Sequence, residues 1–298
     1  MDMFVLVLIG LVTGLTTVLF GFGGGFMTVP VVLWAEAGLG DSAARVAVAT
    51  SAAVMVVNAA VATSATSGAV LRHLRDSRCL LALLGLGGVV GALLARLVPG
   101  AIIQWGFVTY LVGTIVDVLV RPGFFRPTTP HTTDSRRRFA IPTSLGLPIG
   151  ASAAFLGVGG SVMTVPLLRR SGLGMGVATA LANPLTLAIS LPAALIFLIG
   201  HGPGSPAGAA LVGSVDLVAA LALLLGALPV IVTLRRRPPR LPDRVHAISY
   251  ILLLVAVTMT TALAALRYRK NVVPFSMFKA TRIVMAVPAC VTGTRVSV

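Results

Sequence analysis

The sequence predicts an all-α polytopic membrane protein with two inverted repeats, each a glycine-broken helix or hairpin followed by three transmembrane helices. Composition, a duplicated phrase and the placement of arginine predict this class. Hydrophobic residues make up 57% of the 298 residues and charged residues only 10%, whereas a soluble domain carries about 25% charged residues. Apolar runs of about 18 residues or more can cross a bilayer. They lie at 3–20, 42–67, 79–97, 102–119, 140–157, 174–200, 211–234 and 247–266.

A glycine-rich hydrophobic phrase occurs twice. Residues 14–30 read GLTTVLFGFGGGFMTVP, and residues 150–166 read GASAAFLGVGGSVMTVP. Val-Ala-Thr follows each copy, ending at Thr50 and at Thr179. A duplicated unit with a glycine break at the same place in each copy indicates the substrate site of a transporter. The repeat predicts a first membrane repeat at 1–120, an Arg/Pro-rich linker at 121–138, a second repeat at 139–266 and a peripheral tail at 267–298.

Arginine placement predicts how the two repeats face the membrane. The loops at 68–78 and 235–244 are rich in arginine, but their counterparts in the other repeat, 200–210 and 98–101, carry none. Because Lys and Arg in short loops stay inside, the repeats should have opposite orientations. The arginine-rich loops and the linker would then be cytoplasmic at a bacterial plasma membrane. This scheme requires each glycine-broken segment to enter and leave on one side. The alternative has each segment cross once, giving four plus four parallel helices.

The glycines also predict two helix breaks. Each glycine costs about 1 kcal/mol in a helix interior, so a cluster of them favours a break. A half-helix starting after each break would present free N–H groups and a positive dipole end, which suit an anion. The alternative is that the glycines only allow close helix packing, as expected for Gly85, Gly87, Gly88 and Gly91. The candidate substrate-binding residues of the two breaks are Gly21, Gly23, Gly24, Gly25, Gly157, Gly159, Gly160 and Ser161.

Neutral polar side chains near the breaks are further candidate ligands. Hydroxyl and amide groups can donate hydrogen bonds to an anion without the penalty of a buried charge. The alternative is hydrogen bonding between helices, worth about 0.6 kcal/mol each, which we favour for Asn58. No nucleophile–base pair, metal-ligand spacing or phosphate-binding loop is present, so we expect no enzyme activity, no cofactor and no metal. These candidate ligands are Thr28, Thr50, Ser51, Thr164, Thr179 and Asn183.

The basic residues do not predict nucleic-acid binding. The net charge is +15, but the arginines lie in short loops between apolar runs, which is a topology signal. The partners that the sequence does predict are a small anionic substrate and membrane lipid.

The duplicated motif resembles that of the TauE/SafE family of membrane permeases, usually called sulfite exporters. The first copy is Gly21–Gly25, Val29-Pro30 and Ala49-Thr50-Ser51; the second is Gly157–Ser161, Val165-Pro166 and Ala178-Thr179-Ala180. The resemblance covers about 5–266, and Ser161 departs from it by replacing the third glycine. It implies secondary transport, with export as the expected direction, of a small anion such as sulfite or an organosulfonate. A passive anion channel, or a membrane-embedded enzyme or assembly factor, is the alternative.

Overall fold

The computed structural model describes residues 3–74, 77–121, 123–125, 141–199, 211–236 and 241–285, without the side chains of residues 236 and 267–285. The elements of the first repeat are α1 (Met3–Phe20), α2 (Gly25–Ala35), the 3-10 helix η1 (Ala37–Ser42), α3 (Ala43–Ser64), α4 (Gly68–Leu71), η2 (Arg72–Leu74), α5 (Arg78–Leu97) and α6 (Gly100–Val120). Those of the second are η3 (Thr143–Leu145), α7 (Gly146–Leu156), α8 (Ser161–Arg170), α9 (Met175–Ile199), a small hairpin of β1 (Leu211–Val212) and β2 (Val215–Asp216), α10 (Leu217–Arg236) and α11 (Asp243–Met285).

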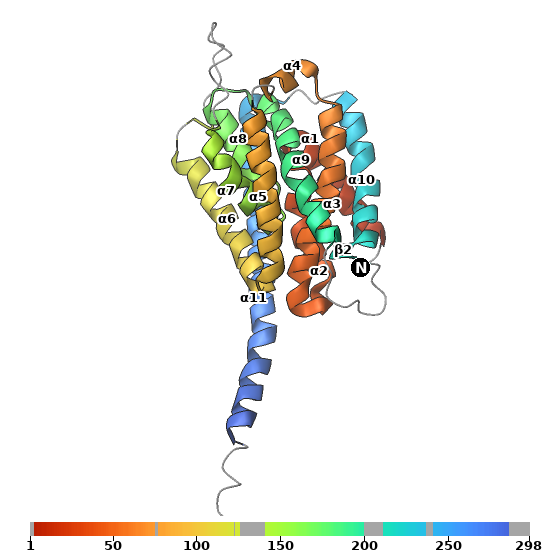
Figure 1. Ribbon diagram of the computed structural model, residues 1–298, viewed down its shortest axis with the longest axis vertical. Helices are drawn as coiled ribbons and strands as arrows, with labels where there is room; N and C mark the ends of the chain where they lie inside the picture. Colours follow the sequence, from red (N-terminus) through yellow and green to blue (C-terminus); the bar gives the residue numbers. More distant parts are fainter. Residues whose placement is uncertain are drawn as a thin grey trace, which may run out of the picture.

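Seven helices of the described part are long and apolar enough to cross a membrane, namely α1, α3 with η1, α5, α6, α9, α10 and the first part of α11. The predicted all-α polytopic membrane fold is confirmed. The last helix, α11, continues along the backbone past Leu266 and projects beyond the bundle (Figure 1). Most of the predicted linker at 121–138, and the loop at 200–210, lie outside the described residues.

The apolar run at 140–157 is long enough for a full crossing, but the structure forms no single spanning helix there. Its described part forms η3 and then α7, which has 11 residues and is therefore about 16 Å long. That is about half the hydrocarbon thickness of a bilayer. Gly157 ends α7 in the left-handed region at φ 67°, and α8 starts four residues later. The length of an apolar run did not reveal this turn, because it depends on a single backbone angle.

Each broken segment packs against a helix of the other repeat. A Cβ added at Gly10 of α1 would lie 2.3 Å from the carbonyl oxygen of Leu223, and one at Gly14 2.5 Å from that of Ala227, both in α10. The residue numbers rise together, so α1 and α10 run parallel. In the same way, α7 packs parallel to α5, where a Cβ at Gly91 would lie 2.2 Å from the Ala151 carbonyl oxygen. The two repeats are thus interlocked.

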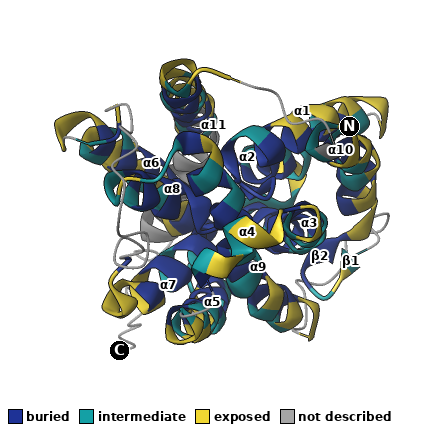
Figure 2. Ribbon diagram, turned by 90° about the horizontal axis from the view of Figure 1, so that it is seen from above, coloured by how far each residue is buried: buried dark blue, intermediate teal, exposed yellow. Residues whose placement is uncertain are grey.

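The helices α3 and α9 form the centre of the bundle. The span of α3 is 67% buried and that of α9 50%, against at most 39% for the other spans. Seen from above, exposed residues gather on the outer rim of the bundle (Figure 2). Many of these outer residues are large and apolar, as Leu221 and Leu225 of α10 are, and such faces suit lipid.

Candidate functional site at the paired glycine breaks

The first glycine break joins α1 to α2. Gly21, Gly23 and Gly24 have φ angles of 72°, 62° and 91°, which side-chain-bearing residues rarely adopt. Gly24 is the N-cap of α2, and its carbonyl accepts a hydrogen bond from the hydroxyl of Thr28 at 2.9 Å. The chain can therefore reverse here only because glycine occupies these positions.

The second break joins α7 to α8 and is similar but not identical. Gly157 and Gly159 have φ angles of 67° and 76°. Gly160, the N-cap of α8, has an ordinary helical φ of −69°, unlike its counterpart Gly24. Ser161, which replaces the third glycine, is the first residue of α8. The backbone conformations of the two breaks are therefore only approximately the same at the helix start.

The two breaks meet inside the protein. The hydroxyl of Ser51 in α3 lies 2.7 Å from the carbonyl oxygen of Gly157 and 3.2 Å from that of Gly25, so it can donate to both breaks. A Cβ at Gly159 would lie 3.3 Å from the carbonyl oxygen of Phe22. The methyl group of Thr186 in α9 lies next to both Gly23 and Gly159. The starts of α2 and α8, far apart in sequence, therefore lie together between α3 and α9.

Buried polar atoms without a hydrogen-bond partner surround the paired breaks. Native proteins contain few such atoms, because each costs about 1–3 kcal/mol. A concentration of them therefore indicates a site for water or a ligand. Among the described residues, the elements that form the breaks and their walls carry such atoms on Arg45, Thr63 and Arg170 as well as the following: the side-chain oxygens of Thr13, Asn58, Ser161, Thr164, Asn183, Thr186 and Ser190, and the Asn58 amide nitrogen.

The predicted ligand Thr50 lies apart from this group. Its hydroxyl oxygen accepts the backbone N–H of Asp216 at 2.9 Å, at the start of α10. The reason is helical geometry, because adjacent residues are turned by about 100° around a helix. When Ser51 faces the breaks, Thr50 faces the neighbouring β2 strand. The structure thus brings the Ser51 hydroxyl to the breaks and the Thr50 hydroxyl to β2.

Thr179 and Asn183 lie closer to the breaks. A Cβ at Gly21 would lie 2.3 Å from the carbonyl oxygen of Thr179. The Thr179 hydroxyl donates to the carbonyl of Gly176 at 3.2 Å, so its own helix engages it. The amide nitrogen of Asn183 donates to the Thr179 carbonyl at 3.3 Å, which leaves the amide oxygen without a partner among the described residues.

The sequence interpretation missed several residues at the breaks. Thr13, Thr186 and Ser190 were not candidates, and Asn58 was assigned to helix packing. A signal existed, because residues spaced by three or four positions share one helix face. Ser51, Met55 and Asn58 have that spacing in α3, and Thr179, Asn183, Thr186 and Ser190 have it in α9.

Aromatic side chains cover the first break on the side of α11. The rings of Phe22 and Phe26 stack at 4.7 Å between centroids, and Phe22 stacks on Tyr250 of α11 at 5.3 Å. The Tyr250 hydroxyl donates to the carbonyl of Val162, in the first turn of α8, at 3.0 Å. Tyr250 therefore connects the cover of the first break to the helix that follows the second.

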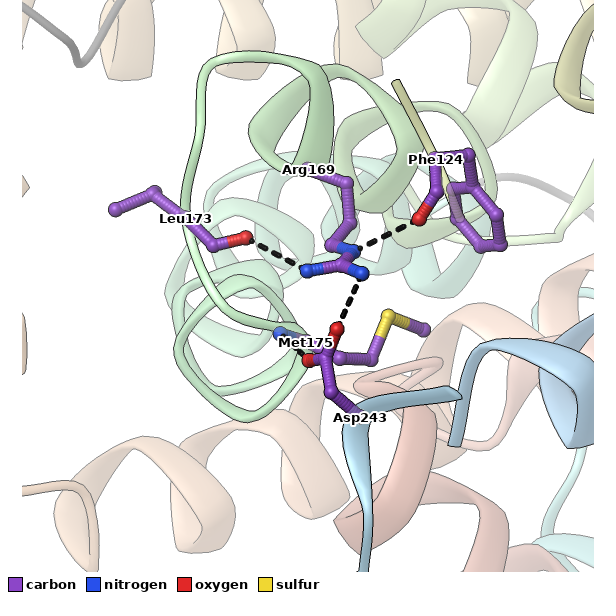
Figure 3. Close-up of polar contacts among 5 residues, drawn as sticks. All are labelled: Phe124, Arg169, Leu173, Met175 and Asp243. Carbon is purple, nitrogen blue, oxygen red and sulfur yellow. Dashed lines mark hydrogen bonds and ion pairs between the residues drawn. The ribbon is translucent and has the colours of Figure 1, made fainter. Parts of the chain in front are cut away.

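The far end of α8 is held by a buried arginine (Figure 3). The side chain of Arg169 is 1% exposed and forms an ion pair with Asp243, the first residue of α11. It also donates to the carbonyls of Phe124 and Leu173. The other carboxylate oxygen of Asp243 accepts the N–H of Met175, where α9 begins. One side-chain pair thus fixes α8, α9 and α11 to one another.

The fold and site define a multi-pass membrane protein with two short, broken hairpins that meet at its centre. The family model described as "Sulfite exporter TauE/SafE" matches residues 6–260, nearly the whole chain. The protein belongs to this family, which is a family of transporters and not of enzymes. The searches of curated proteins and of solved structures found no match.

Proposed function

We propose that this transporter moves a small anion, such as sulfite or an organosulfonate, out of the cell across the bacterial plasma membrane. The observation that carries the proposal is the meeting of the starts of α2 and α8 among buried polar atoms that lack protein partners. Family membership supports a transport function.

The chemistry of the paired breaks favours an anion. The first N–H groups of a helix have no partner within the helix, and the helix dipole places positive potential there. Because Gly24 and Gly160 cap α2 and α8, the capping residues themselves place no side chain over these N–H groups. The hydroxyl of Ser161 and the amide of Asn58 add neutral hydrogen-bonding groups. A site of this kind, which has no charged side chain, can bind an anion and release it again, because release does not require an ion pair between protein and substrate to be broken.

We further propose that the repeats are inverted and that transport uses alternating access. The interlocked pairing supports this, because α1 runs parallel to α10 and α7 runs parallel to α5. In Figure 1, α5 begins at the end of the bundle near α4, whereas α10 begins at the opposite end, beside β2. Rocking one broken hairpin against the other repeat would then expose the breaks to each side in turn.

Arginine placement supports an orientation for this transporter. Arg72, Arg78, Arg121, Arg170 and Arg235 lie at the helix ends nearest α4. The orientation of a membrane protein follows the arginines and lysines in its short loops, which remain on the cytoplasmic side. We therefore place the α4 end, and the linker at 121–138, in the cytoplasm.

Flux of ³⁵S-labelled sulfite in proteoliposomes tests the proposed function. The expected result is uptake driven above the outside concentration by an ion gradient or by exchange with unlabelled anion. Gly24→Ala and Gly159→Ala should remove most of this uptake. Gly113→Ala is the matched control, because Gly113 has no atom near its added Cβ. Flux that only equilibrates would identify a channel, and no flux of sulfite, sulfoacetate or taurine would contradict the proposal.

A further inference from the structure

The two half-helix starts face different surroundings. A Cβ at Gly24 would lie 2.7 Å from the amide nitrogen of Asn58 and 3.6 Å from the hydroxyl of Thr17, with the Thr13 methyl at 2.6 Å. A Cβ at Gly160 would instead lie 2.5 Å from a methyl of Ile189 of α9, and the next residue, Ser161, carries a buried hydroxyl without a partner among the described residues. Polar side chains therefore approach the start of α2, and an apolar one approaches the start of α8.

Asn58 is the least satisfied polar residue at the breaks. It is 0% exposed, and neither its amide nitrogen nor its amide oxygen has a hydrogen-bond partner among the described residues. Thr13 is also 0% exposed and has an unpartnered hydroxyl in the same part of the structure. Unmet groups of this kind are costly. The Asn58 amide nitrogen points at the N-terminus of the 11-residue α2, and the methyl group of Thr13 lies beside it. Two independent features, the helix start and the unpartnered amide, thus indicate a ligand at the same place.

The repeat itself shows that this arrangement is one-sided. When the two glycine-rich phrases are aligned, Thr13 corresponds to Ile149. When the two Val-Ala-Thr segments are aligned, so that Thr50 matches Thr179, Asn58 corresponds to Leu187. The second repeat therefore carries apolar residues at both positions. The unpartnered polar groups of the second repeat, such as Ser161 and Asn183, occupy other positions, so the two helix starts are not equivalent.

We propose that the charged oxyanion group of the substrate, a sulfite, sulfonate or carboxylate, binds at the N-terminus of α2 between Asn58 and Thr13, and not at that of α8. The amide N–H groups of Asn58, the Thr13 hydroxyl and the first N–H groups of α2 donate to its oxygens. This assignment rests on the proposed transport of a small anion. It adds the half of the protein that binds the negatively charged group of the substrate.

A matched pair of hydroxyl deletions tests the assignment. Thr13→Val and Thr186→Val both remove a fully buried, unpartnered hydroxyl while keeping the side-chain shape. Binding of ³⁵S-sulfite to the purified full chain in detergent should weaken about tenfold in Thr13→Val, as expected for a lost hydrogen bond to a charged group, and less than twofold in Thr186→Val. Equal losses, or a larger loss in Thr186→Val, would overturn the one-sided site.

Asn58→Leu, which introduces the residue of the second repeat, provides a second readout. We expect sulfite binding to fall at least tenfold while the melting temperature rises, because an unmet buried amide is replaced by an apolar side chain. Unchanged binding in this variant would overturn the proposal even if Thr13→Val behaved as expected. If the wild-type chain binds sulfite but does not move it, the transport proposal fails and the site assignment stands. If it binds neither sulfite nor sulfoacetate, both fail.

Discussion

The hydroxyl of Ser51, in the first repeat, lies 2.7 Å from the carbonyl oxygen of Gly157, at the break of the second repeat. The carbonyl oxygen of Gly25 lies 3.2 Å from the same hydroxyl. Ser51 is 0% exposed. One small side chain therefore joins the two glycine breaks at the centre of the bundle.

We expect Ser51→Ala to lower the free energy of unfolding by about 1–3 kcal/mol, because buried carbonyls lose a donor. The control is Ser64→Ala, which removes an exposed hydroxyl bonded only within its own helix and should change stability by less than about 0.5 kcal/mol. Thermal unfolding of both purified variants measures the difference. A loss in Ser51→Ala no larger than in the control would show that the link between the breaks contributes nothing.

Gly91→Ala should destabilise the contact between α5 and α7. The added methyl would lie 2.2 Å from the Ala151 carbonyl oxygen and 2.8 Å from the Phe155 nitrogen, so backbone must move at a cost of about 1–3 kcal/mol. Gly113→Ala, with nothing within 4 Å of its new methyl, should be neutral or slightly stabilising. Fluorescence-detected thermal melts compare the two, and equal melting temperatures would contradict the packing role.

Asp243→Asn should destabilise the protein more than Asp117→Asn. Asp243 pairs with Arg169, whose side chain is 1% exposed, whereas Asp117 pairs with Arg170, which is 17% exposed, and with the exposed Arg121. Removing the carboxylate from a buried arginine leaves an uncompensated charge, which costs about 3–5 kcal/mol. Partly hydrated pairs are worth about 1 kcal/mol or less. The reverse order of melting temperatures would show that the Arg169 network is not the stronger anchor.

Glu36, at the end of α2, should make stability depend on pH. Burial, then the negative charge of Asp216 and a side-chain hydrogen bond to it, raise the pKa of Glu36 above 4.5, while the positive charge of the amino terminus lowers it. The folded state therefore binds this proton more tightly than the unfolded state does. The resulting stability is fully present below pH 4.5 and is lost as the pH rises through the raised pKa.

Glu36→Gln isolates this contribution. Between pH 7.5 and 4.5, the melting temperature of the wild-type chain should rise relative to that of Glu36→Gln, which cannot bind the proton. Groups that do not interact with Glu36 titrate equally in both proteins, so the difference between the two curves belongs to Glu36 and its interaction with Asp216. Parallel curves over this range would contradict the predicted coupling.

Cysteine labelling tests the proposed orientation. Cys79, at the start of α5, is exposed, and Ala37, after α2, is exposed near the other end of the bundle. In a Cys290→Ser background, a membrane-impermeant maleimide applied outside intact cells should label Ala37→Cys and spare Cys79. The Ala37→Cys chain should also carry Cys79→Ser. Labelling of Cys79 from outside, with Ala37→Cys spared, would show that the proposed orientation is reversed.

The sequence was sufficient for the fold class because the relevant signals are local. The length of an apolar run such as 102–119 predicts a crossing wherever the chain places it, and α6 confirms it. Gly21 to Gly25 likewise predict a break on propensity alone, and the structure breaks between α1 and α2. The length of the apolar run at 140–157 does not show that its helix is short, but the glycines from Gly157 predict the break that ends α7.

The sequence by itself determined where helices run and where they cannot continue, since both depend on hydrophobicity and on the conformational freedom of glycine. Only the tertiary structure decided which polar groups meet at the breaks. Thr50 and Ser51 are neighbours in the chain, yet one binds β2 and the other joins the breaks. Asn58 and Thr13 approach the same helix start from different helices. The physical reason is that the sequence gives the direction of a side chain around its own helix, whereas the packing of neighbouring helices determines which groups that side chain contacts.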